Sequence, residues 1–216
     1  MTQFIIIVLI IAFLILMALY ANYRENQRRE KIRLLAEGLG LEYAEVLPIR
    51  DQERFTQLPI AQRGNNAKNS SVIIAESEDQ RMLVFNYEYT TGSGKNRTTH
   101  HYSILMCISK QLKLPAMTLQ PEGWQHKIAA FFGGQDIQFE DDAQFNTTYI
   151  VQGPKADAIR AFWTPTRRQK MLERPTEMFE ASNDTFIVYR ARKQLQADQV
   201  HQLMQDGLAM FEILRA

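Results

Sequence analysis

The first stretch of the chain is uniformly apolar, with no alternation between apolar and polar positions. Residues Phe4 to Ala21 read FIIIVLIIAFLILMALYA and include no charged residue, proline or glycine. In a helix these 18 residues (4 to 21) would extend about 27 Å, near the ~30 Å hydrocarbon thickness of a bilayer. A buried helix of a soluble domain usually keeps a polar stripe, and this segment has none. The pattern predicts a transmembrane anchor over residues 1–22 that contacts the lipid bilayer through Phe4–Ala21.

A cleaved signal peptide is the alternative interpretation of this segment. Thr2 and Gln3 supply no basic leader, and the apolar run is longer than the usual core of a signal peptide. The following residues, ALYANY, offer no good pair of small residues for cleavage. We therefore expect the anchor to be retained.

Positive charge follows the apolar run and does not precede it. Because this asymmetry usually keeps the basic side in the cytoplasm, we expect an inner-membrane, single-pass protein with a cytoplasmic C-terminal domain. Each cation near an anionic leaflet adds about 1 kcal/mol of attraction. The flank is therefore a candidate site for anionic lipid headgroups, and a solvated helix face is the plainer alternative. Its cations are Arg24, Arg28, Arg29, Lys31 and Arg33.

The same flank continues with helical spacing. Gly38 and Gly40 are typical of a helix C-terminus, and the apolar residues expected to turn this segment toward a core are Ile32, Leu34, Leu35, Leu39 and Leu41. We predict a juxtamembrane basic helix over 23–40 that runs directly into the soluble domain, with no flexible tether between them.

Beyond residue 40, short apolar runs of strand type alternate with amphipathic stretches of helical type. A polar, turn-rich segment at 62–71 is typical of an exposed loop. The strand candidates are 41–46, 71–77, 81–90, 99–109, 115–121, 135–139, 146–152, 177–182 and 184–192. The helix candidates are 50–59, 124–132, 154–163, 165–174 and 197–215.

Strands in meanders followed by scattered helices are characteristic of the α+β class. We predict an N-terminal transmembrane helix followed by one soluble domain, residues 41–216, with a mainly antiparallel sheet and flanking helices. About 180 residues suffice for one sizeable core and are marginal for two. Trp124 and Trp163 fall on helical apolar stripes and are expected in the core.

The glycine turn within YTTGSGKNRTTHH, residues 89–101, is the most distinctive motif. A P-loop needs G-x-x-x-x-G-K-[ST] between a strand and a helix. Here Tyr89 stands at the first glycine position, Asn96 follows Lys95, and the next residues are of strand type. The motif therefore predicts a hairpin. A register centred on Gly94 would place Val84 opposite Ile104, and a slip by one residue is left open.

The tip of this hairpin is a candidate ligand-binding site. Lys95 and Arg97 would project from a turn in which Gly92 and Gly94 take positive φ angles. Free N–H groups of such a turn can form a small nest for an anion, such as a phosphorylated ligand or a lipid headgroup. A solvated tip is the alternative.

Catalytic and metal-binding signals are weak. The register above sets Glu88 opposite His100, which is a candidate acid/base pair, although an exposed ion pair is the plainer interpretation. Consecutive residues of a strand point to opposite faces, so His100 and His101 cannot jointly bind one metal. We expect no metal site and no cofactor. Cys107 is the only cysteine and lies in an apolar run, which is typical of a buried structural thiol.

Composition narrows the class of partner. The chain is 45% hydrophobic and 23% charged, with a formal net charge of +1. These values are typical of globular proteins, and no segment interleaves aromatic and basic residues as a nucleic-acid platform does. We expect no nucleic-acid partner.

Several segments together resemble a family of bacterial proteins. They are YEYTTGSGKNRTTHHYSILM, LPAMTLQPEG, GGQDIQF and TFIVYRAR, which span most of the chain after about Leu34. They are similar to an uncharacterised family of bacterial single-pass membrane-anchored proteins that carry a segment like YTTGSGKNR. The resemblance implies an N-terminal hydrophobic helix and a soluble domain, but no activity or catalytic residue. His101 departs from the family's segment.

Three functional hypotheses follow from the sequence. The first is a membrane-anchored protein whose cytoplasmic domain binds a protein partner or an anionic ligand, and it is more consistent with the motifs than an enzyme. The second is a membrane-tethered, hydrolase-like enzyme that uses Glu88 and His100. The third is a scaffold for other membrane proteins.

Overall fold

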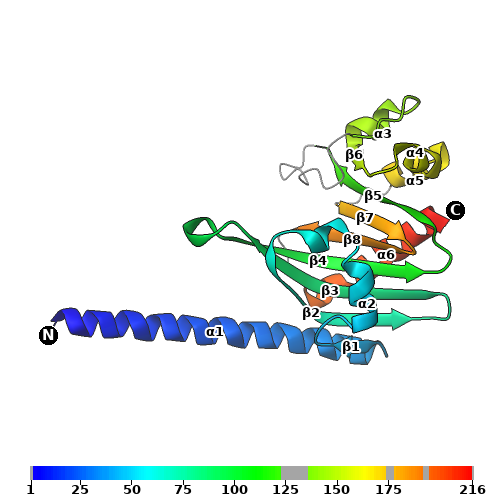
Figure 1. Cartoon of the computed structure of the whole chain (residues 1–216). Coiled ribbons are helices and arrows are strands. Elements are labelled where there is room, and N and C mark those ends of the chain that lie inside the picture. The colour runs from blue at the N-terminus through cyan, green and yellow to red at the C-terminus, as the bar shows by residue number, and fades with distance from the viewer. Residues whose placement is uncertain (1, 123–135, 174–177, 192–194, 216) are drawn as a thin grey trace.

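The computed structural model describes residues 2–122, 136–173, 178–191 and 195–215. Its longest element is helix α1, Thr2–Gly38, which is continuous over 37 residues. The helix extends away from the rest of the molecule along its N-terminal half (Figure 1). The most apolar 18-residue stretch of this helix is exposed along its length and has a mean hydropathy of 3.2. One helix is therefore long and apolar enough to cross a membrane.

An eight-stranded sheet forms the body of the protein, in the order β1-β2-β3-β4-β8-β7-β5-β6. Every neighbouring pair is antiparallel. The prediction of an α+β chain with an N-terminal apolar helix, an antiparallel sheet and flanking helices is confirmed. The strands are β1 Glu42–Ala44, β2 Asn65–Glu76, β3 Gln80–Thr91, β4 Thr98–Ser109, β5 Leu114–Pro121, β6 Tyr149–Gln152, β7 Met178–Asn183 and β8 Thr185–Ala191.

Both faces of the sheet are buried, because helices cover each of them. On β3, Val84 contributes to one hydrophobic cluster and Phe85 to the other, as the period of two along a strand requires. The C-terminal part of α1 and helix α6, Ala197–Arg215, pack on the first face. Helix α2, Ile49–Phe55, and a 3₁₀ turn, Pro59–Gln62, pack on the second.

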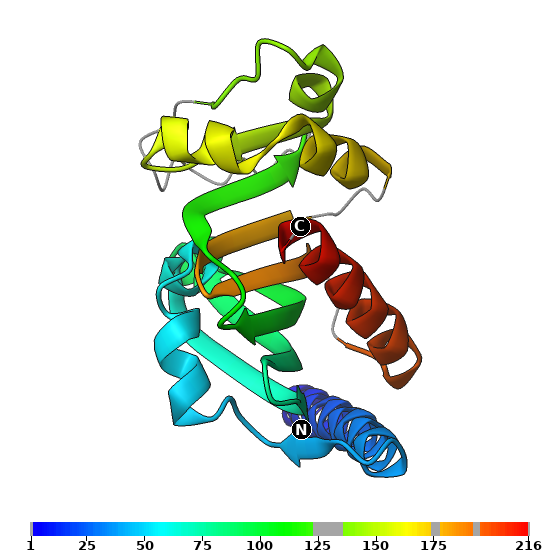
Figure 2. The same ribbon diagram turned by 90° about the vertical axis from the view of Figure 1, so that its right-hand side faces the viewer.

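Three short helices gather at the β6 end of the sheet, at the top of Figure 1. They surround Trp163, which is fully buried against Phe145 and Phe179, as the sequence predicted for this tryptophan. Figure 2, turned by 90° about the vertical axis, shows the same helices at one end of the molecule and α1 at the other. The three helices are α3 Ala143–Thr148, α4 Ala156–Phe162 and α5 Pro165–Glu173.

The expected loop at 62–71 is wrong, because most of it belongs to strand β2. Asn65 pairs with Thr90 and Lys68 with Glu88. The register of β2 against β3 shifts between Asn65 and Lys68 and again between Ser70 and Ile73. Asn66 and Ser71 take positive φ angles of 53° and 56° at these irregularities. A bulged strand with exposed polar side chains has the composition of a loop, which explains the error.

Two smaller expectations also differ. Residues 136–139 form no strand, although the Ile137 N–H donates a hydrogen bond to the Val151 carbonyl. The expected strand 146–152 is helical up to Thr148 and extended from Tyr149. The expected helix 124–132, with Trp124, lies outside the described residues.

Candidate functional site

The glycine turn forms the tip of the β3–β4 hairpin, as predicted. Gly92 and Gly94 have φ angles of 74° and 56°. A Cβ at position 92 would lie 2.3 Å from the Asn96 carbonyl oxygen, so only glycine fits there. The nest of free N–H groups is smaller than expected, because the Asn96 and Arg97 amides donate to the Ser93 and Gly94 carbonyls within the turn.

The register of the hairpin differs by one residue from the predicted one. Val84 pairs with Leu105, not Ile104, and Thr91 pairs with Thr98. The turn therefore holds the six residues 92–97, and its centre falls between Gly94 and Lys95 rather than on Gly94. An even number of turn residues shifts every cross-strand pair by one, which changes the candidate acid/base pair.

Glu88 and His100 do not form the expected pair. His100 pairs with Tyr89, stacks on its ring at 5.0 Å, and is hydrogen-bonded to the Thr91 hydroxyl at 2.8 Å. Glu88 instead lies opposite His101, and its Oε2 is 3.2 Å from His101 Nδ1. The Glu88 and His101 side chains are 35% and 39% exposed, so both are partly open to solvent. Glu88 thus contacts the other histidine, His101.

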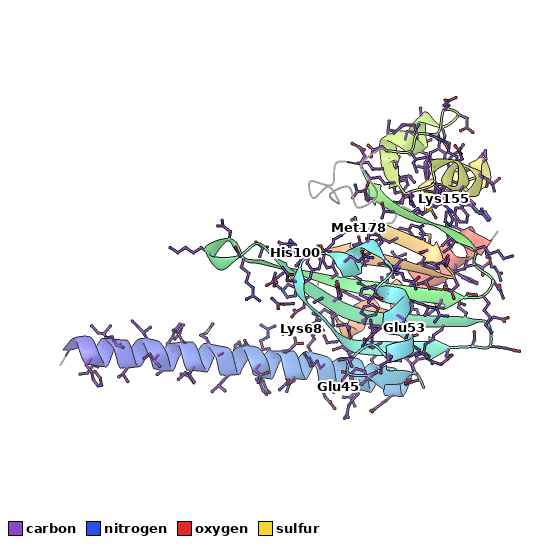
Figure 3. The ribbon with its side chains drawn as sticks, in the orientation of Figure 1. Glu45, Glu53, Lys68, His100, Lys155 and Met178 are labelled. Carbon is purple, nitrogen blue, oxygen red and sulfur yellow. The ribbon has the colours of Figure 1, made fainter. Side chains whose placement is uncertain are left out.

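A small polar pocket lies where α1 passes the sheet. Its volume is about 140 Å³, and Glu25 and Arg29 of α1 face Lys68, Glu88 and His101 across it. Both acidic and basic side chains line the pocket, and Arg29 Nε is 2.9 Å from Glu25 Oε1. In Figure 3, Lys68 lies between α1 and the sheet, and Glu45, which follows β1, lies beside the helix. The pocket therefore fixes which part of α1 is level with Glu88.

The basic flank of α1 is partly engaged within the chain, and the binding of anionic lipid headgroups by its cations stays a prediction. The Arg28 guanidinium bonds to Glu25 and to the Leu195 carbonyl oxygen, and its side chain is only 10% exposed. Arg29 pairs with Glu25, and Arg33 pairs with Glu30. The hydrogen bonds from the Arg28 guanidinium to the Glu25 carboxylate lower the pKa of Glu25.

Arg24 and Lys31 are the two flank cations that make no ion pair within the described part of the chain. Both side chains are exposed. The hairpin tip carries a second pair of cations in the same condition. Lys95 and Arg97 are exposed, and neither forms an ion pair with any residue that the structure describes.

A second and larger hollow lies at the opposite end of the sheet from the hairpin tip. This distal groove has a volume of about 1160 Å³. Its lining comes from α2, the start of β5, α4 and the β7–β8 turn, and combines apolar and charged side chains: Glu53, Arg54, Leu114, Pro115, Lys155, Ala158, Ala161, Phe162 and Asp184. The sequence did not indicate it, because each of the four segments contributes only a few unremarkable residues. In Figure 3, Glu53 and Lys155 lie on either side of this region.

The thiol of Cys107 is buried as expected, with 0% exposure. Burial raises its pKa to about 11, and the Gln80 side-chain amide lies 3.3 Å from the sulfur and works against this rise. Among the residues that the structure describes, no three His, Cys, Asp or Glu side chains cluster as a metal site. Cys107 is therefore a core residue in this fold.

Comparisons with known proteins identify the fold and not a family. No protein-family model and no curated protein sequence matches the chain. Among solved structures, the mycobacterial trehalose monomycolate transport factor A, TtfA, is similar with a TM-score of 0.58 and 10% sequence identity. The match covers 87% of this chain and 94% of that chain. The chain therefore has the fold of TtfA over almost its whole length.

Proposed function

We propose that the protein is a single-pass inner-membrane protein whose cytoplasmic domain is a binding module and not an enzyme. The apolar part of α1 is exposed along its length, which is costly in water and favourable in lipid. Positive charges follow this part and none precede it, which supports a cytoplasmic domain. In this arrangement the domain stands directly at the membrane surface.

One observation carries the proposal: the membrane helix is also a core helix of the domain. Ile32 and Ala36 of α1 are fully buried in the same hydrophobic cluster as β4 and α6. Arg28 adds a hydrogen bond to the Leu195 carbonyl. Arg28 lies seven residues beyond Ala21, about 10 Å along a helix. The domain is therefore held at a set height and orientation above the bilayer, which suits a protein that positions a partner there.

The absence of a suitable acid/base arrangement at the predicted place favours binding over catalysis. His100 is turned into the aromatic stack with Tyr89, and Glu88 meets His101 in a half-exposed contact. The distal groove, by contrast, is large enough for a peptide or a helix of a partner protein, and it mixes apolar with charged side chains as protein interfaces do. We infer that a protein partner occupies this groove.

The similar solved structure gives the proposal a direction. TtfA is described as a mycobacterial trehalose monomycolate transport factor. We propose that this chain likewise serves a transport process at the membrane, as an accessory factor that binds the transport proteins. The scaffold hypothesis is a special case of this role, in which the bound partner is another membrane protein.

Site-specific photo-crosslinking in intact cells tests the partner site. A photoreactive amino acid replaces the exposed groove residue Ala158, and Glu78, at the β2–β3 turn, serves as the control position. Both positions lie at the end of the sheet opposite the hairpin tip, but only Ala158 lines the groove. We expect one discrete protein adduct from position 158 and none from position 78.

A charged variant gives an independent measurement. Ala158→Glu should abolish the crosslink formed from position 161 without changing the amount of folded protein, since both alanines are exposed. Identical crosslinking at positions 78 and 158, or an adduct from position 161 that survives Ala158→Glu, would overturn the groove as the partner site. Accessibility of the domain from outside intact cells would overturn the cytoplasmic placement.

A further inference from the structure

The tip of the β3–β4 hairpin points toward the same side of the molecule as the N-terminal half of α1 (Figure 1). Figure 2, turned by 90°, shows α1 strongly foreshortened, so the helix axis runs along the horizontal of Figure 1. We propose that this tip, residues 92–97, lies in the headgroup layer of the bilayer that α1 spans, and that Lys95 and Arg97 bind anionic lipid headgroups there. The inference rests on the membrane-spanning role of α1 in the proposed function and names the ligand of the tip.

The polar pocket sets the height of the hairpin relative to α1. Glu88 and His101 line the pocket together with Glu25 and Arg29, so they lie beside the turn of α1 from Glu25 to Arg29. Glu25 and Arg29 follow Ala21 by four and eight residues. At about 1.5 Å per residue, Glu88 therefore stands roughly 6–12 Å above the end of the apolar run.

The hairpin is long enough to close this gap. From Glu88 to Thr91 the strand advances three residues, about 10 Å at roughly 3.3 Å per residue. The six-residue turn adds several ångströms, so the tip extends about 15 Å beyond Glu88. This reach is greater than the 6–12 Å gap, and Figure 1 shows the hairpin and α1 running in nearly the same direction. Since the reach exceeds the gap by about 3–9 Å, the tip lies at or just past the level where the apolar run of α1 ends.

The arm that carries the tip is ordered along its length. Every residue from Gln80 to Thr91 pairs with a residue of β4, up to Thr91 with Thr98. The stacked rings of His100, Tyr89 and Tyr102 stiffen its base, with centroids 5.0 Å and 5.6 Å apart. A paired, aromatic-backed hairpin holds its tip in place, so the contact with the bilayer follows from the docking of α1 and needs no rearrangement.

The chemistry of the tip suits headgroups and not hydrocarbon. Residues 92–97 are all exposed, and their side chains are polar, basic or absent: Gly92, Ser93, Gly94, Lys95, Asn96 and Arg97. With no apolar side chain to insert, the tip would stop in the polar layer. Lys95 and Arg97 would there meet phosphate oxygens, and each cation near an anionic surface is attracted to it. Lys95 and Arg97, like Arg24 and Lys31 of the α1 flank, make no ion pair with any residue that the structure describes.

A depth measurement tests the position of the tip. The full-length chain with Ser93→Cys is labelled with a fluorophore and placed in nanodiscs that contain lipids with a nitroxide quencher in the headgroup. Glu78→Cys, at the opposite end of the sheet, is the matched control, and native Cys107 is buried. We expect at least two-fold stronger quenching at position 93 than at position 78. Equal quenching at the two positions, in discs that retain the chain, would overturn the inference.

The lipid composition tests the chemistry. At equal mole fractions of the two lipids, quenching at position 93 should be at least two-fold stronger when phosphatidylglycerol carries the nitroxide than when phosphatidylcholine carries it, and Lys95→Ala with Arg97→Ala should remove this difference. Lys110→Ala with Lys170→Ala removes the same charge from exposed sites elsewhere and should leave it intact. Equal quenching by the anionic and the zwitterionic lipid would overturn headgroup binding by Lys95 and Arg97. A chain that does not enter the discs at all would instead overturn the proposed function.

Discussion

The Arg28 guanidinium donates a 2.9 Å hydrogen bond to the carbonyl oxygen of Leu195, which lies 167 residues further along the chain. The same guanidinium binds Glu25 through two further hydrogen bonds. Leu195 lies two residues before the start of α6, and its amide donates to the Asn86 side chain on β3 at 2.6 Å. Arg28 thus joins the apolar helix, the start of the last helix and the sheet at one point.

Replacing Arg28 should therefore weaken the attachment of α1 to the domain. Hydrogen bonds to charged groups contribute about 1.5–3 kcal/mol, so we expect Arg28→Ala to lower the free energy of unfolding by about 2 kcal/mol. Urea unfolding of the full chain in mild detergent measures this loss of unfolding free energy. Arg33→Ala, which breaks exposed ion pairs only, should cost less than about 1 kcal/mol. Equal losses would contradict the special role of Arg28.

The buried carboxylate of Glu180 predicts a stability that depends on pH. Glu180 is 0% exposed and accepts hydrogen bonds from Arg63, the Ile60 amide and the Tyr189 hydroxyl at 2.8–2.9 Å. Burial raises its pKa, although the Arg63 charge and both other donors oppose the rise. A raised carboxyl pKa means that the folded state binds the proton more tightly, so its contribution to stability falls as the pH rises above the ordinary value.

Arg63→Ala should therefore cost more at pH 8 than at pH 5. Leaving a buried carboxylate without its cation costs about 3 kcal/mol at neutral pH, and protonation relieves part of this cost in acid. Adding Glu180→Gln should recover most of the loss, because the amide carries no charge. Unfolding free energies at the two pH values measure this, and a loss that is independent of pH would show that Glu180 is already neutral in the native protein.

Asp142 should contribute with the opposite sign. It caps α3 by accepting from the Phe145 amide at 2.9 Å, and Arg168 Nε donates to it at 2.8 Å. Burial works to raise the pKa of Asp142, but Arg168 and the Phe145 amide outweigh it and lower the pKa. A lowered pKa gives stability that is present above the ordinary pKa and is lost as the pH falls through the folded-state value.

We expect Asp142→Ala to lower the free energy of unfolding by about 1–2 kcal/mol at pH 7, and by less near pH 3. Asp157→Ala is the control, because Asp157 is fully exposed and makes only a surface pair with Arg160. The same deficit for Asp142→Ala at both pH values would mean that its charge does not contribute.

The contact of Gly207 with Leu105 predicts a clash that can be relieved. A Cβ on Gly207 would lie 2.4 Å from both terminal methyl groups of Leu105, where α6 crosses β4. Gly207→Val should therefore destabilise by about 1–3 kcal/mol despite better helix propensity. Leu105→Ala should lower the free energy of unfolding less in the Gly207→Val variant than in the unaltered chain. Gly38→Ala, with no atom within 4 Å of the new Cβ, should be neutral or stabilising.

Cys107 should be unreactive in the folded protein. Its burial and its pKa of about 11 leave little accessible thiolate at pH 8. We expect reaction with a thiol reagent to be at least ten-fold slower in the native chain than in urea. A Ser93→Cys variant should react at once, since position 93 is exposed. Comparable rates for the two cysteines would place Cys107 at a surface.

Local pattern was sufficient to predict several elements. Eighteen apolar residues without a break predict one exposed helix, and the amphipathic period places the last helix at Ala197–Arg215. The strand candidates 177–182 and 184–192 leave one residue between them, Asn183, which lies in the β7–β8 turn with a positive φ of 57°. These features depend on neighbours in the sequence, so the sequence contains the information directly.

The pairing of distant segments was decided by the tertiary structure. Whether Glu88 meets His100 or His101 depends on the number of residues in one turn, and a polar strand such as β2 is recognisable only by its partner β3. The distal groove arises from four separated segments. The height of the hairpin tip above the membrane depends on the packing of Ile32 and Ala36 against the sheet. Hydrophobic period specifies which face of an element is buried, but only three-dimensional packing specifies what it is buried against.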